Sequence, residues 1–66
     1  MQYNIVFINS EGRKLISRHS DLEEAKKAGK AYFEKTKRGE AVICMSGNID
    51  DDGNIEGKYI LYEAWT

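Results

Sequence analysis

The sequence has no proline, one cysteine and one histidine among its 66 residues. A single cysteine, Cys44, excludes an intrachain disulfide and any zinc site built from several cysteines. No apolar run approaches the roughly 20 residues that a membrane-spanning helix needs. The first residues also carry no basic segment of the kind that opens a secretory signal. We therefore expect a cytoplasmic protein with no membrane association.

Residues with catalytic chemistry are equally scarce. The sequence contains no glycine-rich phosphate loop, no cluster of metal ligands and no nucleophile motif. A pairing of Cys44 with His19 requires the fold to bring both within hydrogen-bond reach, together with an orienting group such as Asp21. No motif supports that arrangement, so we expect no enzyme and no cofactor.

The overall composition predicts one small folded domain spanning residues 1–66. Hydrophobic residues make up 41% and charged residues 32% of the chain, as in soluble globular proteins. The net charge is −1, with nine bases against five acids in residues 1–39 and one base against six acids in residues 40–66. This balance predicts no general attraction to nucleic acid, because such binding depends on neutralising phosphates.

The central stretch predicts one amphipathic helix over about residues 20–38. Ser20 is a suitable N-cap, Glu23 completes a capping box, and Gly39 is a typical helix stop. A spacing of about 100° per residue places one apolar stripe toward the sheet. Gly29 lies within this stripe, and we expect it to allow close approach of the helix to the element it covers, since glycine is otherwise unfavourable there. The stripe consists of Leu22, Ala25, Ala28, Gly29, Tyr32, Phe33 and Thr36.

Two hairpins are predicted on either side of the helix, because β-branched and aromatic runs are separated by turn residues. The first joins residues 3–8 to residues 14–18 through a loop at residues 10–12. The second joins residues 40–46 to residues 58–65. If residues 51–53 form its loop, Ile49 lies opposite Ile55 and Gly47 lies opposite Gly57. The prediction is an α+β fold, ββαββ, in which both hairpins form a four-stranded, mainly antiparallel sheet with the helix on one face. Strand order and the register of the second hairpin stay open. The arrangement is similar to short ββαββ proteins of bacteria and their phages in length and topology, without a shared motif.

A second sheet face with large apolar side chains is the main functional prediction. The expected loop places Phe7 opposite Leu15 and Val6 opposite Ile16, which turns Val6, Ile8 and Ile16 away from the helix. One helix covers one face, so a protein partner or a second copy of the chain is predicted on the other, and the chain is interpreted as a protein-interaction or homodimerising module. The alternative is that a curled hairpin covers part of this face. The predicted interaction face comprises Val6, Ile8, Ile16 and Tyr62, with Tyr59 replacing Tyr62 in another register.

The last third of the chain carries residues for two other kinds of site. Aromatic side chains on a strand can stack single-stranded bases, so the alternative function is nucleic-acid binding. Its residues are Lys58, Tyr59, Tyr62 and Trp65. The acidic tip resembles part of an EF-hand calcium loop, with oxygen ligands at Asn48, Asp50 and Asp52. Tyr59 stands where that loop has a bidentate glutamate, so an ordinary acidic turn is the competing interpretation. The same tip could also contact a basic partner.

Overall fold

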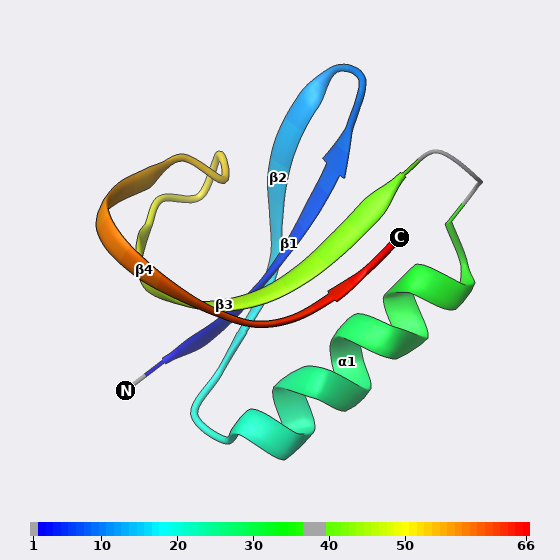
Figure 1. Cartoon of the computed structure of the whole chain (residues 1–66), viewed down its shortest axis with the longest axis horizontal. Helices are drawn as coiled ribbons and strands as arrows, with labels where there is room; N and C mark the ends of the chain where they lie inside the picture. Colours follow the sequence, from blue (N-terminus) through cyan, green and yellow to red (C-terminus); the bar gives the residue numbers. More distant parts are fainter. Residues whose placement is uncertain (1, 37–39) are drawn as a thin grey trace.

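The fold is a four-stranded antiparallel sheet with one helix packed across it. The computed structural model describes residues 2–36 and 40–66. The sheet order β2-β1-β3-β4 places β1 and β3 in the centre and β2 and β4 at the edges (Figure 1). The predicted ββαββ arrangement is confirmed, and the strand order that the sequence left open is settled. The elements are β1 (Tyr3–Asn9), β2 (Gly12–His19), α1 (Leu22–Glu34), β3 (Ala41–Ile49) and β4 (Ile55–Trp65).

The helix is shorter than predicted at both ends. Its N-cap is Asp21, whose carboxylate accepts a hydrogen bond from the amide of Glu24 at 3.1 Å. The predicted cap at Ser20 is therefore wrong by one residue, because Asp21, an equally good acceptor, takes the capping position. At the other end the amide and the hydroxyl of Thr36 both donate to the carbonyl of Phe33, which closes the last turn soon after Glu34. The predicted stop at Gly39 lies outside the described residues.

The helix covers one face of the sheet with the predicted stripe. Ile5, Val42 and Cys44 from the central strands pack with Ala25 in the helix-side core. Two edge-to-face ring pairs flank this core, Phe7 with Tyr32 and Tyr3 with Tyr62. Partly buried side chains complete the helix-side core: Tyr3, Phe7, Ile16, Leu22, Ala28, Tyr32, Phe33, Tyr62 and Trp65.

Gly29 has the close neighbour that its position in the stripe predicts. A Cβ at this residue would lie 2.5 Å from Cζ3 and 2.7 Å from Cη2 of Trp65, and 3.2 Å from Cδ1 of Ile5. These separations are shorter than van der Waals contact, so the ring of Trp65 occupies the space that any side chain would need. The last residues of β4 are thereby held against the helix.

The register of the first hairpin differs from the prediction. Its loop has two residues, with Asn9 paired to Gly12, and the Asn9 side chain accepts from the amide of Glu11 at 2.9 Å. Ile5 faces Ser17 as expected, but Val6 faces Leu15, so the ladder carries a bulge at Ile16. The predicted pairs of Phe7 with Leu15 and Val6 with Ile16 are wrong. The bulge turns Ile16 into the helix-side core.

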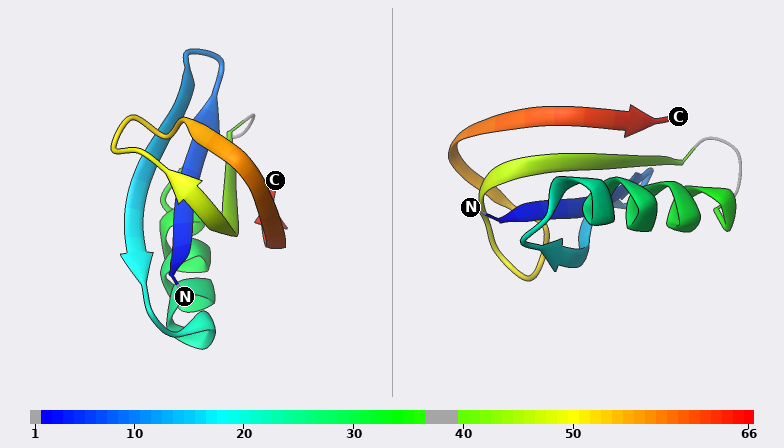
Figure 2. Two further views of the ribbon diagram at one scale, coloured as in Figure 1. Left: turned by 90° about the vertical axis from the view of Figure 1, so that its left-hand side faces the viewer. Right: turned by 90° about the horizontal axis from the view of Figure 1, so that it is seen from below.

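The second hairpin bends strongly. Figure 2 shows the end of the β3–β4 hairpin curling around so that its tip lies beside β2. The ladder is irregular at Gly47, which faces Tyr59 and not Gly57 as predicted, whereas Ile49 faces Ile55 as predicted. Gly47 and Gly57 have φ of +136° and +75°, a conformation that L-residues rarely adopt. The two glycines thus permit the bend, although they are not paired.

No helix among the described residues is long and apolar enough to span a bilayer.

Candidate interaction surface on the edge strand

The sheet face opposite the helix is closed by the chain itself. Asn4, Val6 and Met45 alternate with the helix-side residues of β1 and β3 and therefore point away from the helix. Their exposed fractions are 1%, 0% and 0%. The covering element is the hairpin tip, since Gly53 is buried and a Cβ there would lie 3.0 Å from Lys14 N and Arg13 C of β2. We call residues 49–55 the tip.

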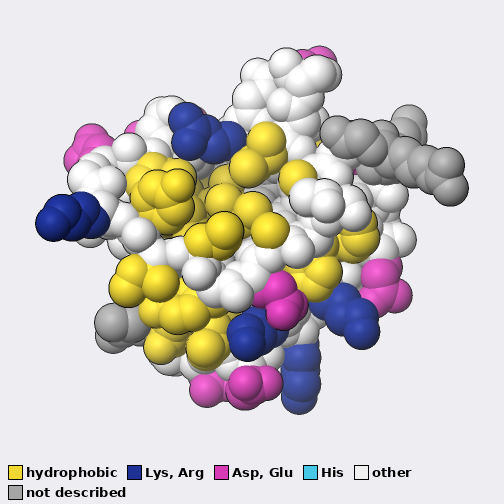
Figure 3. Space-filling view, viewed as in Figure 1, with side chains coloured by type: hydrophobic (Ala, Val, Ile, Leu, Met, Phe, Trp, Pro, Cys, Tyr) yellow, Lys and Arg dark blue, Asp and Glu magenta, His cyan; other side chains and the backbone are white. Residues whose placement is uncertain are grey.

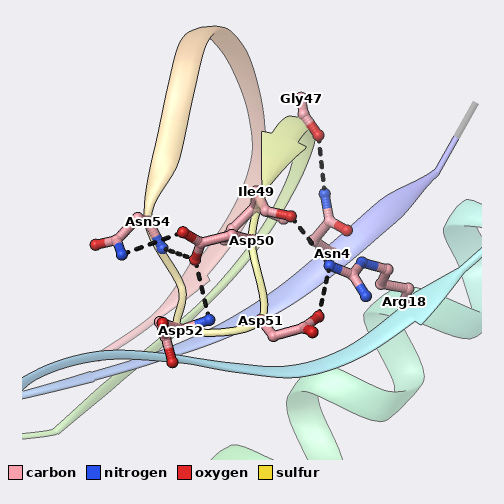
Figure 4. A network of polar contacts seen from close by, with 8 residues as sticks. All are labelled: Asn4, Arg18, Gly47, Ile49, Asp50, Asp51, Asp52 and Asn54. Carbon is pink, nitrogen blue, oxygen red and sulfur yellow. Dashed lines mark hydrogen bonds and ion pairs between the residues drawn. The ribbon is translucent and has the colours of Figure 1, made fainter.

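Polar contacts fasten the tip to the sheet (Figure 4). Nη2 of Arg18 on β2 donates to the carbonyl of Ile49 at 3.0 Å and to the carboxylate of Asp51 at 3.2 Å. At the bend in β3 that precedes the tip, the side-chain amide of Asn4 donates to the carbonyl of Gly47 at 3.4 Å. Among the described residues no buried side-chain polar atom lacks a partner. The second face is therefore both packed and hydrogen-bonded within one chain.

This closure corrects the interaction face predicted from sequence. Val6 is fully buried, so it has no surface to offer a partner. Ile16 and Tyr62 pack in the helix-side core, the first because of the bulge and the second against the ring of Tyr3. Ile8 alone of the four points away from the helix with part of its side chain exposed. The curled-hairpin interpretation, also open from sequence, describes this face.

The acidic tip is organised by one carboxylate. The side chain of Asp50 accepts from the amides of Asp52 and Asn54, both at 2.9 Å, and from the side-chain amide of Asn54 at 3.2 Å. The hydrogen bond from the Asn54 amide is the main reason why the pKa of Asp50 is lowered below its ordinary value of 3.8. No cluster of three or more His, Cys, Asp or Glu side chains suited to a metal occurs among the described residues. Of the predicted calcium ligands Asn48, Asp50 and Asp52, Asp50 already uses its carboxylate to accept hydrogen bonds within the turn.

Acidic pH is expected to destabilise the tip, because it protonates the carboxylate of Asp50. A carboxyl whose pKa is lower in the folded protein stabilises the fold above its unfolded pKa, and this contribution disappears as the pH falls through the folded value. The Asp50→Asn variant should therefore be less stable than the wild type at pH 7, with the difference shrinking below about pH 4. Urea unfolding across the pH range measures this difference. Asp52→Asn is the matched control, since it removes the same charge without touching the carboxylate that caps the turn. Equal pH dependence of the two variants would contradict the role given to Asp50.

Most of the aromatic surface that was predicted to stack nucleic-acid bases is partly buried. Tyr62 and Trp65 are partly buried in the helix-side core, where Tyr62 Oη lies 3.3 Å from Ser46 Oγ and Trp65 lies against Gly29. Lys58 and Tyr59 are exposed. One exposed ring does not form the row of stacked platforms that the sequence suggested, so the grouping of these four residues as one surface is corrected.

The histidine and the cysteine lie on strands that are separated by β1. His19 on β2 faces Tyr3, while Cys44 on β3 faces Ile5, so two strand spacings, roughly 10 Å, separate their strands. Nε2 of His19 is 2.7 Å from the hydroxyl of Ser17 instead. Burial raises the pKa of the Cys44 thiol. Such a thiol acts as a small buried hydrophobe and not as a nucleophile.

The largest exposed apolar side chains are three consecutive residues of β4. Tyr59, Ile60 and Leu61 are 54%, 55% and 51% exposed. Apolar side chains gather on the left half of the face drawn in Figure 3, over the region where β3 and β4 lie, with charged side chains around them. A hollow of about 330 Å³ beside Tyr59 and Ile60 is completed by Ser46, Gly47 and Lys58.

The backbone of β4 adds to this surface. β4 pairs with β3 on one side, and no described strand pairs with its other side. An unpaired strand edge offers a row of N–H and C=O groups to another chain. Sequence reasoning missed this site in part, since it named Tyr59 but not Ile60 or Leu61. The signal was the run Tyr59–Tyr62 at the centre of a strand that had an assigned neighbour on one side only.

Comparison with models of protein families, with curated proteins and with solved structures finds no match for this chain, so no family assignment follows from similarity.

Proposed function

We propose that the chain is a protein-interaction module that binds its partner, a different protein or a second copy, through the outer edge of β4. The observation that carries this proposal is the run of three large, half-exposed apolar side chains, Tyr59 to Leu61, on an edge strand. Single exposed apolar residues are common on protein surfaces, but contiguous ones on a free strand edge mark sites of association.

The mode of binding that fits this surface is strand addition. An extended segment pairs with the free edge through backbone hydrogen bonds, and alternate side chains on the two sides supply specificity. Tyr59 and Leu61 point to one side of β4 and Ile60 to the other, because Tyr59, Ile60 and Leu61 face successive residues of β3. A bound strand would therefore meet apolar surface on both sides. The closed second face makes no contribution to this proposal.

Affinity capture with folded point variants tests the proposal. Leu61→Asp places a charge on the binding edge, at a side chain that is already half exposed and so should change stability by less than about 1 kcal/mol. Ala31→Asp, on the exposed face of α1, is the control that introduces the same charge away from the binding edge. We expect wild type and Ala31→Asp to retain the same protein and Leu61→Asp to lose at least ninety per cent of it, on the order of a tenfold weakening. Equal capture by all three, or capture by none, would refute the proposal.

A further inference from the structure

We infer that the tip is a hinged strap, which rotates away from the second face as one unit about Gly47 and Gly57 while the rest of the sheet and the helix stay folded. Val6 and Met45, both 0% exposed in the closed structure, become accessible to solvent when the tip opens. The closed state is the major one, because opening transfers apolar side chains to water. This motion belongs to the second face and is independent of the partner proposed for the edge of β4.

The hinge is a break in the β3–β4 ladder that crosses both strands at one level. Gly47 faces Tyr59, but the next residue, Asn48, faces Glu56, so two residues of β4 lie between the paired positions. Gly57 is one of these two, and its φ of +75° and that of +136° at Gly47 are conformations that glycine adopts most easily. At Gly57 an added Cβ would meet nothing within 4 Å, so the backbone has room to rotate. A few residues that absorb a large change in φ and ψ are what a hinge requires.

The tip is held in shape by hydrogen bonds among its own residues. The amide of Asp50 donates to the carbonyl of Asn54 at 3.0 Å, and the amide of Gly53 donates to the carbonyl of Asp50 at 3.1 Å. The carboxylate of Asp50 accepts two further backbone amides of the turn, and Ile49 pairs with Ile55 at its base. Because these bonds join residues of the tip to one another, a rotation about the two glycines breaks none of them.

An arginine on β2 holds the closed tip against the sheet. Nη2 of Arg18 bonds both the carbonyl of Ile49 and the carboxylate of Asp51 (Figure 4). The side chains of this ion pair are 38% and 91% exposed. A pair exposed to this degree shifts an equilibrium by no more than about fivefold. The packing of Gly53 on the backbone of β2 is the second contact, and since both belong to one turn, rotation of the tip breaks them together.

The sheet side of the hinge is fixed in place. Asn4 of β1, which is 1% exposed, donates to the carbonyl of Gly47 at 3.4 Å. The residue before the hinge, Ser46, pairs with Tyr3 on one side and with Ile60 on the other. The rotation is therefore confined to the segment between the two glycines, and the central ladder of the sheet persists in the open state.

Thiol labelling on the two faces of the sheet tests the strap. The natural Cys44 lies in the helix-side core, so iodoacetamide reaches it only when the helix leaves the sheet. Val6→Cys in a Cys44→Ala background places the single thiol beneath the tip instead. We expect this thiol to react at least about tenfold faster than complete unfolding allows, and Cys44 to react at the rate that complete unfolding sets. Urea unfolding of each protein supplies this reference rate, because complete unfolding exposes either thiol.

Removal of the arginine separates opening of the tip from other motions. Arg18→Met keeps the aliphatic part of the side chain but cannot donate to Ile49 or Asp51. It should raise the labelling rate of the thiol at position 6 about three- to tenfold, as expected for the loss of such hydrogen bonds. Labelling of Cys44 should still follow complete unfolding. Arg13→Met is the matched control, since it removes the same charge from the same strand, and it should change labelling beneath the tip by less than about twofold.

Labelling of both thiols at the rate of complete unfolding would show that the tip and the sheet open only together, and would overturn the strap. So would Arg18→Met if it left labelling beneath the tip unchanged, or if Arg13→Met raised it as much. Far-UV circular dichroism checks that each variant is folded. If Val6→Cys does not fold, Met45→Cys in the same background gives a thiol on the same face, with the same expected rates. All these measurements use the isolated protein, so failure of the β4 edge as a binding site would leave them unaffected.

Discussion

The Val6→Asp variant is expected to be unfolded in neutral buffer. Val6 is 0% exposed, enclosed between the sheet and the tip of the chain's own second hairpin. A carboxylate placed there has neither water nor a cationic partner, and leaving a charge unpaired in the interior costs several kcal/mol. A domain of this size rarely has more than about 3–5 kcal/mol of stability in total. The substitution should therefore remove most or all of the folded population.

Urea unfolding and far-UV circular dichroism measure this outcome. The matched control is Ile60→Asp, which makes a similar change at a side chain that is 55% exposed and should remain folded. Val6→Ala supplies a graded variant, with an expected loss of about 2 kcal/mol from the deleted methyl groups and the cavity they leave. A folded Val6→Asp protein with stability close to that of Ile60→Asp would mean that the second face is open to solvent.

The main elements and their order could be predicted because their signals are local. The acidic first turn and the apolar stripe through Ala25 and Gly29 indicate the helix, and alternating β-branched runs indicate the strands. The position of the turn at the tip could also be predicted, because the Asp50 side chain can accept hydrogen bonds from the backbone and Gly53 can adopt a positive φ. The exact start of the helix could not be predicted, because Ser20 and Asp21 are both good caps and only the three-dimensional contacts choose between them.

Which side chains share a face of the sheet could not be predicted, because one extra residue in a strand reverses the direction of every side chain beyond it. Loops of two and three residues fit Ser10–Gly12 equally well from sequence, and the Asn9 side chain selects the shorter one. The resulting bulge moves Ile16 to the helix side. Strand order depends on β1 pairing with β3, which are more than 30 residues apart, and no local pattern encodes such a pairing.

The predicted docking face failed for a related reason. Counting one helix for two apolar faces is sound, but it does not decide between a partner and a hairpin of the same chain as the element that covers the second face. The bend depends on backbone conformations at Gly47 and Gly57 and on the fit of Gly53 against β2. These are properties of the assembled chain. Once the tip is in place, the exposed apolar surface moves from the centre of the sheet to its β4 edge.

Two glycine substitutions separate the docking of the tip from ordinary backbone strain. Gly53 and Gly57 have φ of +87° and +75°, so alanine at either costs about 1 kcal/mol from the left-handed conformation alone. At Gly57 nothing lies within 4 Å of an added Cβ, whereas at Gly53 it would lie 3.0 Å from backbone atoms of Arg13 and Lys14. Backbone atoms of a paired strand cannot move aside easily, and such overpacking costs about 1–3 kcal/mol.

The difference in unfolding free energy between Gly53→Ala and Gly57→Ala, measured by urea unfolding in dilute solution, is the most direct test of closure by the tip. We expect Gly53→Ala to be less stable than Gly57→Ala by about 1–3 kcal/mol. Equal stabilities for the two variants would show that the tip does not rest on β2, and the second face of the sheet would again be available to a partner.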